Sequence, residues 1–300
     1  MRRRALTRAS VLLAGALLAG CSYAAPVDRS TVESAAPLAD GGVAVAFRQL
    51  RYRPATGWAA FPDGGIPRYL DDAVTVGVLS PGGGARILRR WPNPGVHGAF
   101  HVTFRASPAD PEHLLVLRSW QPIGQGATTA AWSRLAWRDG RIEPYPDFAQ
   151  ALQAEGRRFG ASSFGDVRAL DATGALLIGA EGDAGDELWI YEAGRGLRRL
   201  DGFKHFYDVA GDELYYWRGD EAVLRNWRTG AERLVARYDP GTHVTTRYLL
   251  RDPAVQAAET AAPAASVEIA DGGAVRVRRP GGEVAEFRPP ASWWPSGPGR

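Results

Sequence analysis

The stretch from Asp166 to Leu200, DVRALDATGALLIGAEGDAGDELWIYEAGRGLRRL, decides the fold class. Short apolar runs such as LLIGA and LWIY are separated by glycine and aspartate residues, which are typical of tight turns. The spacing predicts four strands, with turns near Ala172, Asp183 and Gly194. Each run is too short for a helix that buries one face, so we expect a small antiparallel sheet.

The next stretch, Phe206–Tyr238, has the same pattern and predicts four more strands, with turns near Gly211, Gly219 and Gly230. Two consecutive four-stranded units of about 35–40 residues match the blades of a β-propeller. Three less regular units are expected at residues 42–91, 98–148 and 243–287. We therefore predict an all-β, β-propeller-like domain of roughly five four-stranded units. A β-sandwich or barrel has similar short strands and remains the alternative fold.

Two segments between the predicted strands have helical features. In Asp147–Glu155, Asp147 and Gln150 have the spacing of a capping box, and Asp252–Ala262 has a proline at its first helical position. We expect both to be short insertions between strands. In the Pro/Gly-rich C-terminal tail, Trp293 and its neighbour Trp294 are expected to hold the tail on the domain surface.

The first 20 residues have the features of an export signal. Four arginines precede residue 9, and the apolar run VLLAGALLAG, Val11–Gly20, is shorter than a membrane span. The tetrad LAGC, Leu18–Cys21, ends in the only cysteine of the chain. Here the chain resembles bacterial lipoprotein precursors, whose lipobox has this form.

The resemblance implies that a signal peptidase cuts before Cys21 and that the Cys21 thiol carries a diacylglyceryl group. Several acyl chains on one residue, palmitate among them, are enough for stable anchoring to a membrane. In such lipoproteins an aspartate directly after the cysteine causes retention at the inner membrane. Ser22 stands there in this chain, so the resemblance implies an outer-membrane protein that faces the periplasm.

We therefore predict four parts: a signal peptide at 1–20, a lipidated flexible tether at 21–41, the β domain at 42–288 and the tail at 289–300. Residues 1–20 hold four arginines and no acidic residue, so their removal takes the formal charge from +3 to −1. A nearly neutral mature chain lacks the basic surface that nucleic-acid binding requires.

The segment Arg51–Asp72, RYRPATGWAAFPDGGIPRYLDD, is predicted to be a long aromatic loop. Its candidate binding residues are Trp58, Phe61, Arg68 and Tyr69. Aromatic rings and arginines on a loop over a rigid β scaffold are typical of recognition surfaces, and here they would suit a sugar or a peptide. The alternative is that these rings are buried and close the N-terminal side of the domain.

The sequence assigns no catalytic residue. It contains no nucleophile elbow, phosphate-binding loop or zinc-binding helix motif. His97 and His101 could share one face of a strand, but we expect a solvent-facing histidine, no metal and no cofactor. The expected function is a non-catalytic binding or scaffold module at the membrane surface, with a protein partner or an envelope polymer as ligand. A carbohydrate-active or other hydrolase on a propeller scaffold is the alternative function.

Overall fold

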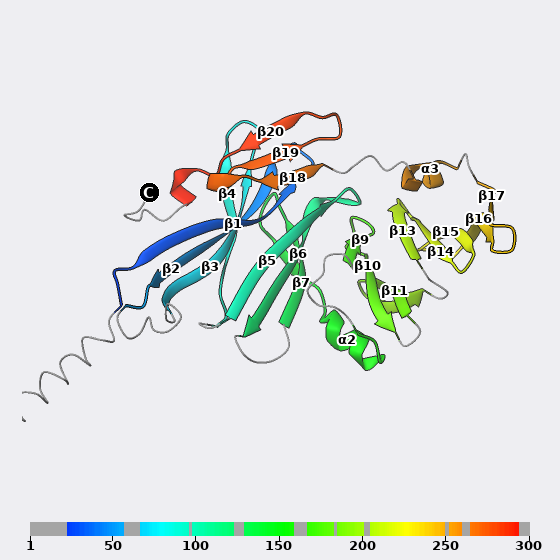
Figure 1. Cartoon of the computed structure of the whole chain (residues 1–300), viewed down its shortest axis with the longest axis horizontal. Coiled ribbons are helices and arrows are strands. Elements are labelled where there is room, and N and C mark those ends of the chain that lie inside the picture. The colour runs from blue at the N-terminus through cyan, green and yellow to red at the C-terminus, as the bar shows by residue number, and fades with distance from the viewer. Residues whose placement is uncertain are drawn as a thin grey trace, which may run out of the picture.

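The structure is a computed structural model, and it describes residues 23–56, 67–95, 98–122, 129–158, 167–182, 185–200, 205–249, 252–259 and 265–293. In these ranges the strands form five small antiparallel sheets of three to five strands (Figure 1). In each sheet the strands pair in sequence order. The predicted all-β class with repeated small sheets is confirmed.

Sheets 1 and 2 occupy the N-terminal half of the chain. Sheet 1 contains β1 (Val27–Pro37), β2 (Val43–Arg53), β3 (Arg68–Leu79) and β4 (Ala85–Pro92). Sheet 2 contains β5 (Gly98–Ser107), β6 (Asp110–Pro122), β7 (Thr129–Ala136) and β8 (Ile142–Pro144). Helix α2 (Phe148–Ala154) follows sheet 2.

Sheets 3, 4 and 5 complete the domain. Sheet 3 contains β9 (Val167–Ala169), β10 (Leu176–Gly182), β11 (Gly185–Glu192) and β12 (Gly196–Leu200). Sheet 4 contains β13 (His205–Ala210), β14 (Glu213–Arg218), β15 (Glu221–Asn226), β16 (Glu232–Asp239) and β17 (Val244–Arg247). Helix α3 (Pro253–Glu259) precedes sheet 5, which contains β18 (Ser266–Ile269), β19 (Val275–Arg278) and β20 (Val284–Phe287). Two 3₁₀ turns, η3 (Asp271–Gly273) and η4 (Ala291–Trp293), lie in this last part.

The apolar runs form strands that are buried on both faces. In β10, Leu176 and Ile178 pack towards sheet 2, while Leu177 packs towards sheet 4. In β2, Val45 faces sheet 5 and the smaller Ala46 faces sheet 2. Because successive side chains of a strand point to opposite faces, a continuous apolar run fits a sheet that lies between two others.

Neighbouring sheets pack face to face in the order 5, 1, 2, 3, 4, and each neighbouring pair shares an apolar cluster. Representative buried residues of these interfaces are Phe47 and Val275, Val76 and Val116, Trp132 and Ile178, and Ile190 and Leu214. The first strand of sheet 1, β1, contacts both β5 and β18. Sheets 4 and 5 are the two ends of this series, and no cluster among the described residues joins them (Figure 1).

The tether predicted for residues 21–41 is wrong over Val27–Pro37, which forms β1. This segment is polar and rich in small residues, so its own pattern is weak. It becomes a strand because the edge of β2 supplies backbone partners along its whole length. Small side chains such as Ala36 then fit between the neighbouring sheets.

The fifth predicted unit, residues 243–287, is also divided differently. Residues Val244–Arg247 form β17, which pairs with β16 as the edge strand of sheet 4. Sheet 5 begins only at Ser266 and has three strands. The two units predicted in Asp166–Leu200 and Phe206–Tyr238 are confirmed, because their turns and pairings are local.

The predicted helices and the C-terminal clip are confirmed. Asp147 caps α2 by accepting a hydrogen bond from the Gln150 backbone N–H at 3.1 Å. Trp293 stacks on Phe47 with 5.1 Å between ring centroids. A Cβ on Gly77 would lie 2.3 Å from the Trp293 ring, so only glycine permits this contact. Trp294 lies outside the described residues.

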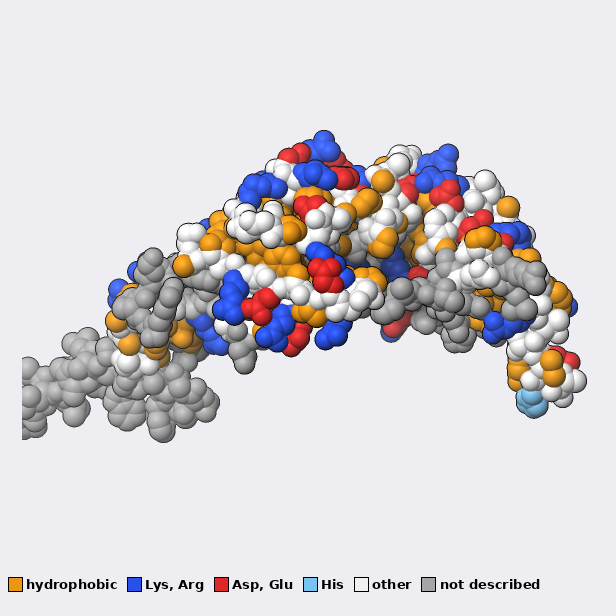
Figure 2. Space-filling model, turned by 90° about the horizontal axis from the view of Figure 1, so that it is seen from above, with side chains coloured by type: hydrophobic (Ala, Val, Ile, Leu, Met, Phe, Trp, Pro, Cys, Tyr) orange, Lys and Arg blue, Asp and Glu red, His pale blue; other side chains and the backbone are white. Residues whose placement is uncertain are grey.

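From above, the molecule is an elongated arch on whose visible surface positive and negative side chains are interspersed (Figure 2). This mixture agrees with the nearly neutral charge expected of the mature chain. In the part of the chain that the structure describes, no helix is long and apolar enough to cross a membrane.

Candidate functional site

The predicted lipidation and binding residues divide between described and undescribed parts of the chain. Cys21, Trp58 and Phe61 lie outside the described residues, whereas Arg68 and Tyr69 begin β3. The segment Arg51–Asp72 is therefore not a loop throughout. Its two ends continue the β2–β3 ladder, because strand pairing extends outward to the Arg53–Arg68 pair.

We use the name hairpin base for the last three pairs of this ladder and the adjoining start of β1. The pairs are Arg51–Asp71, Tyr52–Tyr69 and Arg53–Arg68, and β1 joins them at Val27. Tyr52 pairs with Tyr69 across the two strands, and their ring centroids are 6.3 Å apart. A register shift between these pairs leaves Leu70 as an extra residue on β3. Arg68 is exposed, so the base presents aromatic, aliphatic and cationic groups at one end of sheet 1, where β2 and β3 stop.

The N-terminal end of the described chain joins the same place. Tyr23 forms an isolated bridge with Ala55, and the Ala24 N–H donates to the Pro54 carbonyl at 2.9 Å. In Figure 1 the start of β1 lies beside the free ends of β2 and β3, which project at one end of the molecule. Residues close to the proposed lipidation site thus contact the hairpin base, a neighbourhood that the sequence alone did not indicate.

A polar network crosses sheet 1 next to this base. Arg48 donates from Nε and Nη2 to the two carboxylate oxygens of Asp72, at 2.7 and 2.5 Å. Asn93 donates to the same carboxylate at 2.7 Å, and Arg48 Nη1 lies 3.7 Å from Glu33. Both oxygens of Asp72 are engaged, so this carboxylate joins the strands of sheet 1 to one another.

Glu33 occupies the bulge of β1, which turns its carboxyl group towards sheet 2. Its side chain is mostly buried, with His101 Nδ1 at 3.9 Å from Oε2. Burial raises the pKa of the Glu33 carboxyl above its ordinary value, although Arg48 and His101 oppose this shift. Buried Oε2 accepts no hydrogen bond from any described residue. The carboxyl group can therefore hold a proton at a higher pH than an exposed glutamate.

Sequence reasoning missed an aromatic and cationic group between sheets 1 and 2. Arg118 lies over the Trp91 ring at 5.8 Å from its centroid, and burial and then Arg89 lower the pKa of its guanidinium. Two buried donors, Arg118 Nε and Trp120 Nε1, have no hydrogen-bond partner among the described residues. A Cβ on Gly95 would lie 2.7 Å from the Trp120 ring, so glycine is needed there. Ordered water commonly satisfies such donors.

His101 and His113, both on sheet 2, have different surroundings. His101, on β5, has a side chain that is 54% exposed, while His97 lies outside the described residues. His113 Nδ1 is 2.8 Å from buried Asp110, which also accepts from Arg134 Nε at 2.6 Å. In the described ranges no group of three or more His, Cys, Asp or Glu residues could hold a metal ion.

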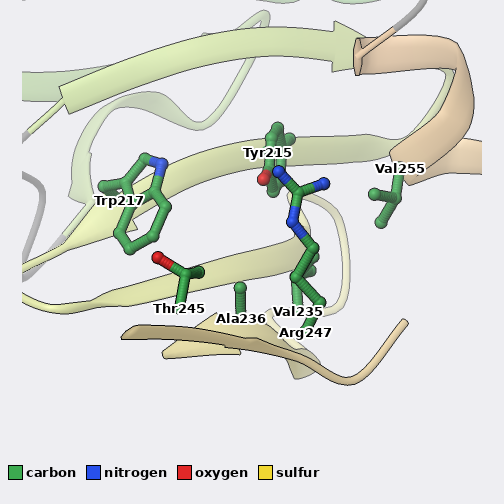
Figure 3. Close-up of a pocket in the computed structure, with 7 residues that line it drawn as sticks. All are labelled: Tyr215, Trp217, Val235, Ala236, Thr245, Arg247 and Val255. Carbon is green, nitrogen blue, oxygen red and sulfur yellow. The ribbon is translucent and has the colours of Figure 1, made fainter. Parts of the chain in front are cut away.

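A small pocket lies between sheet 4 and α3 (Figure 3). Its lining residues are Tyr215, Trp217, Val235, Ala236, Thr245, Arg247 and Val255. Figure 3 shows Trp217 and Thr245 at one end and Val255 at the other. The volume of about 20 Å³ is enough for one water molecule but not for an organic ligand. This pocket is a packing space rather than a binding site.

Comparison with known proteins assigns no family to these features. No protein-family model matches the chain, and no curated protein matches it either. The functional interpretation therefore rests on the chemistry of the hairpin base and of the N-terminal segment.

Proposed function

We propose that the chain is an envelope lipoprotein whose β domain is a non-catalytic binding module at the membrane surface. The lipobox Leu18–Cys21 supports the anchor, and Ser22 supports an outer-membrane location facing the periplasm. The observation that carries the binding role is the hairpin base, where Tyr52 and Tyr69 pair beside the exposed Arg68. Aromatic residues and arginine dominate the binding free energy of many interfaces.

In this proposal the β2–β3 hairpin recognises a protein partner or an envelope polymer. Trp58 and Phe61, which belong to the connection beyond the described ladder, are the anchors of recognition. Arg68 and Tyr69 are the described members of the same set. The two strands of the ladder supply a rigid support for that connection, which reduces the conformational entropy lost on binding.

We also propose that the five sheets are the units of a β-propeller-like domain rather than a sandwich or a barrel. The support is the serial packing of sheets 5, 1, 2, 3 and 4, each a meander of consecutive strands. A sandwich packs only two sheets on one another. In a propeller every sheet has neighbours on both faces, as sheets 1, 2 and 3 do here.

Crosslinking in cells followed by purification of the tagged protein tests the proposal. Trp58→Ala combined with Phe61→Ala should reduce partner capture about tenfold or more, because two anchors are lost. The melting temperature should stay within a degree or two of the wild-type value. Tyr248→Ala is the matched control, since this aromatic residue is 52% exposed and directly follows β17 of sheet 4.

Cys21→Ala tests the anchor separately. This variant should lose palmitate labelling and give a soluble or an unprocessed protein. Continued labelling would reject the lipoprotein assignment. Normal capture by the Trp58/Phe61 variant, together with a large fall in melting temperature, would show that the rings serve packing and not recognition.

A further inference from the structure

The proposed lipidation site, Cys21, lies very close in sequence to the folded domain. Only Ser22 separates Cys21 from Tyr23, which is already paired with Ala55. A fully extended chain covers about 3.6 Å per residue, so the Cα atoms of Cys21 and Tyr23 are about 7 Å apart at most. A lipid on Cys21 would therefore keep the hairpin base within reach of the membrane surface.

The charge of the hairpin base suits an anionic surface. Arg53 and Arg68 lie directly opposite each other in the ladder, and neither forms an ion pair with a described residue. Like charges in this position destabilise a sheet unless an external anion compensates them. Among the described residues the acidic neighbours are already engaged, since Asp28 lies 3.7 Å from Arg51, and Asp71 accepts from Arg90.

Apolar groups accompany these cations. Tyr23, Val27 and Leu70 are 41%, 40% and 44% exposed, and all three lie on the hairpin base or the segment paired with it. Tyrosine and leucine beside arginine are typical of surfaces that enter the headgroup region of a bilayer. The paired residues Tyr52 and Tyr69 belong to the same group, since Val27 pairs with Tyr52, and Leu70 follows Tyr69.

We propose that the hairpin base, with Arg53 and Arg68 as its phosphate-binding residues, docks on the anionic phospholipid surface that holds the Cys21 lipid. The proposal rests on the lipidation proposed above, but not on the identity of the partner held by the hairpin connection. At this base the bilayer is the ligand of Arg53 and Arg68, while Trp58 and Phe61 of the connection remain the anchors for the partner, and Arg68 lies at the junction of the two surfaces. The covalent lipid brings base and bilayer together at high effective concentration. The two arginines and the acyl chains then supply two separate membrane-binding interactions.

The test uses the purified lipidated protein in vesicles. Hydrogen exchange of residues 23–30, 50–56 and 67–72 is compared in phosphatidylglycerol/phosphatidylethanolamine vesicles and in phosphatidylcholine vesicles. We expect slower exchange only in the anionic vesicles. Arg53→Gln combined with Arg68→Gln should weaken docking by about fivefold per arginine, and about 1 M salt should abolish it. Arg276→Gln with Arg278→Gln, on the exposed face of β19, should have no effect.

The outcomes separate the two proposals. A protein that does not float with phosphatidylcholine vesicles has no lipid anchor, and the proposed function itself fails. A protein that floats, yet exchanges equally in both vesicle types, overturns docking alone. Unchanged protection in the Arg53/Arg68 variant also overturns it. Protection that requires an added envelope protein assigns the base to a protein partner instead.

Discussion

At the scale of single residues, Glu33 shows how a strand irregularity creates an unusual group. The bulge at this position directs a carboxyl group into the contact between β1 and β5. Arg48, Asp72 and His101 are the charged or titratable groups that influence it. Because desolvation is the largest effect, ionised Glu33 destabilises the fold, although Arg48 compensates part of that loss.

Replacing Glu33 with glutamine should therefore stabilise the protein at neutral pH by roughly 1 kcal/mol. The folded-state pKa lies above the unfolded value, so the folded protein binds more protons between the two values. The contribution of Glu33 to the free energy of unfolding is therefore fully present at low pH. It is lost as the pH rises through the raised pKa. Urea unfolding of wild type and Glu33→Gln between about pH 4 and about pH 8 measures the difference.

Exposed Glu268→Gln is the matched control for this titration and should behave as wild type across the same range. A difference between wild type and Glu33→Gln that does not grow with pH would contradict the role assigned to the Glu33 carboxyl. The variants are needed because the pH dependence of wild type alone also includes other carboxyls. Asp171 and Asp252, for example, have lowered pKa values, so their contributions to stability change with pH in the opposite direction.

At the scale of elements, arginines join each sheet to the next. In each case a guanidinium donates to a turn carbonyl of the neighbouring sheet. The four bonds are Arg279 to Gly41, Arg86 to Trp137, Arg134 to Ala172 and Arg198 to Trp227. They follow the order 5, 1, 2, 3, 4 of the apolar clusters and align the turn ends of adjacent sheets. The high arginine content of the chain is thus used partly in packing.

Arg134 is the most buried of these four donors, so its loss should be the most damaging. Arg134→Met leaves Asp110, which is only 5% exposed, with His113 but without its guanidinium partner, and should cost about 3–5 kcal/mol in unfolding free energy. Urea unfolding checks this value. Arg279→Met is the control and should cost less than about 1 kcal/mol, because its ionic partner Glu283 is exposed. Equal losses in the two variants would contradict the importance of burial.

At the scale of the whole molecule, β1 determines where the domain begins. Its removal would expose the edge of β2 and uncover the contacts with β5 and β18. A chain that starts at residue 42 should therefore aggregate, whereas one that starts at Ser22 should be a monomer rich in β structure. Size-exclusion chromatography and circular dichroism distinguish these outcomes. A cooperative, monomeric residue 42–300 fragment would show that β1 is dispensable.

The whole molecule also has a defined polarity. The hairpin base projects at one end, and sheet 4 lies towards the other (Figure 1). A lipid at Cys21 would place the base against the bilayer, with the series of sheets extending from it. Without a long tether, the orientation of the domain depends on contacts at this base.

The sequence predicted elements whose pairing is local. Strands β9 to β16, with their glycine turns, follow from alternation and turn residues within each stretch, and so do the caps of α2 and α3. These features require only neighbours a few residues away. The segment Arg51–Asp72 was predicted as a loop, and its composition did not show that the β2–β3 ladder extends to Arg53 and Arg68, because these residues are not typical strand signals.

The sequence by itself thus determined the all-β class and the repeated small sheets of this protein, and it marked Arg51–Asp72 as an aromatic segment. Only the tertiary structure decided that Val27–Pro37 is a strand, that Tyr23 joins the hairpin base, and that Glu33 and Arg118 lie between sheets. The physical reason is sequence distance. A weak strand such as β1 forms because distant elements supply its hydrogen bonds and packing partners, and such partners leave no trace in the local pattern.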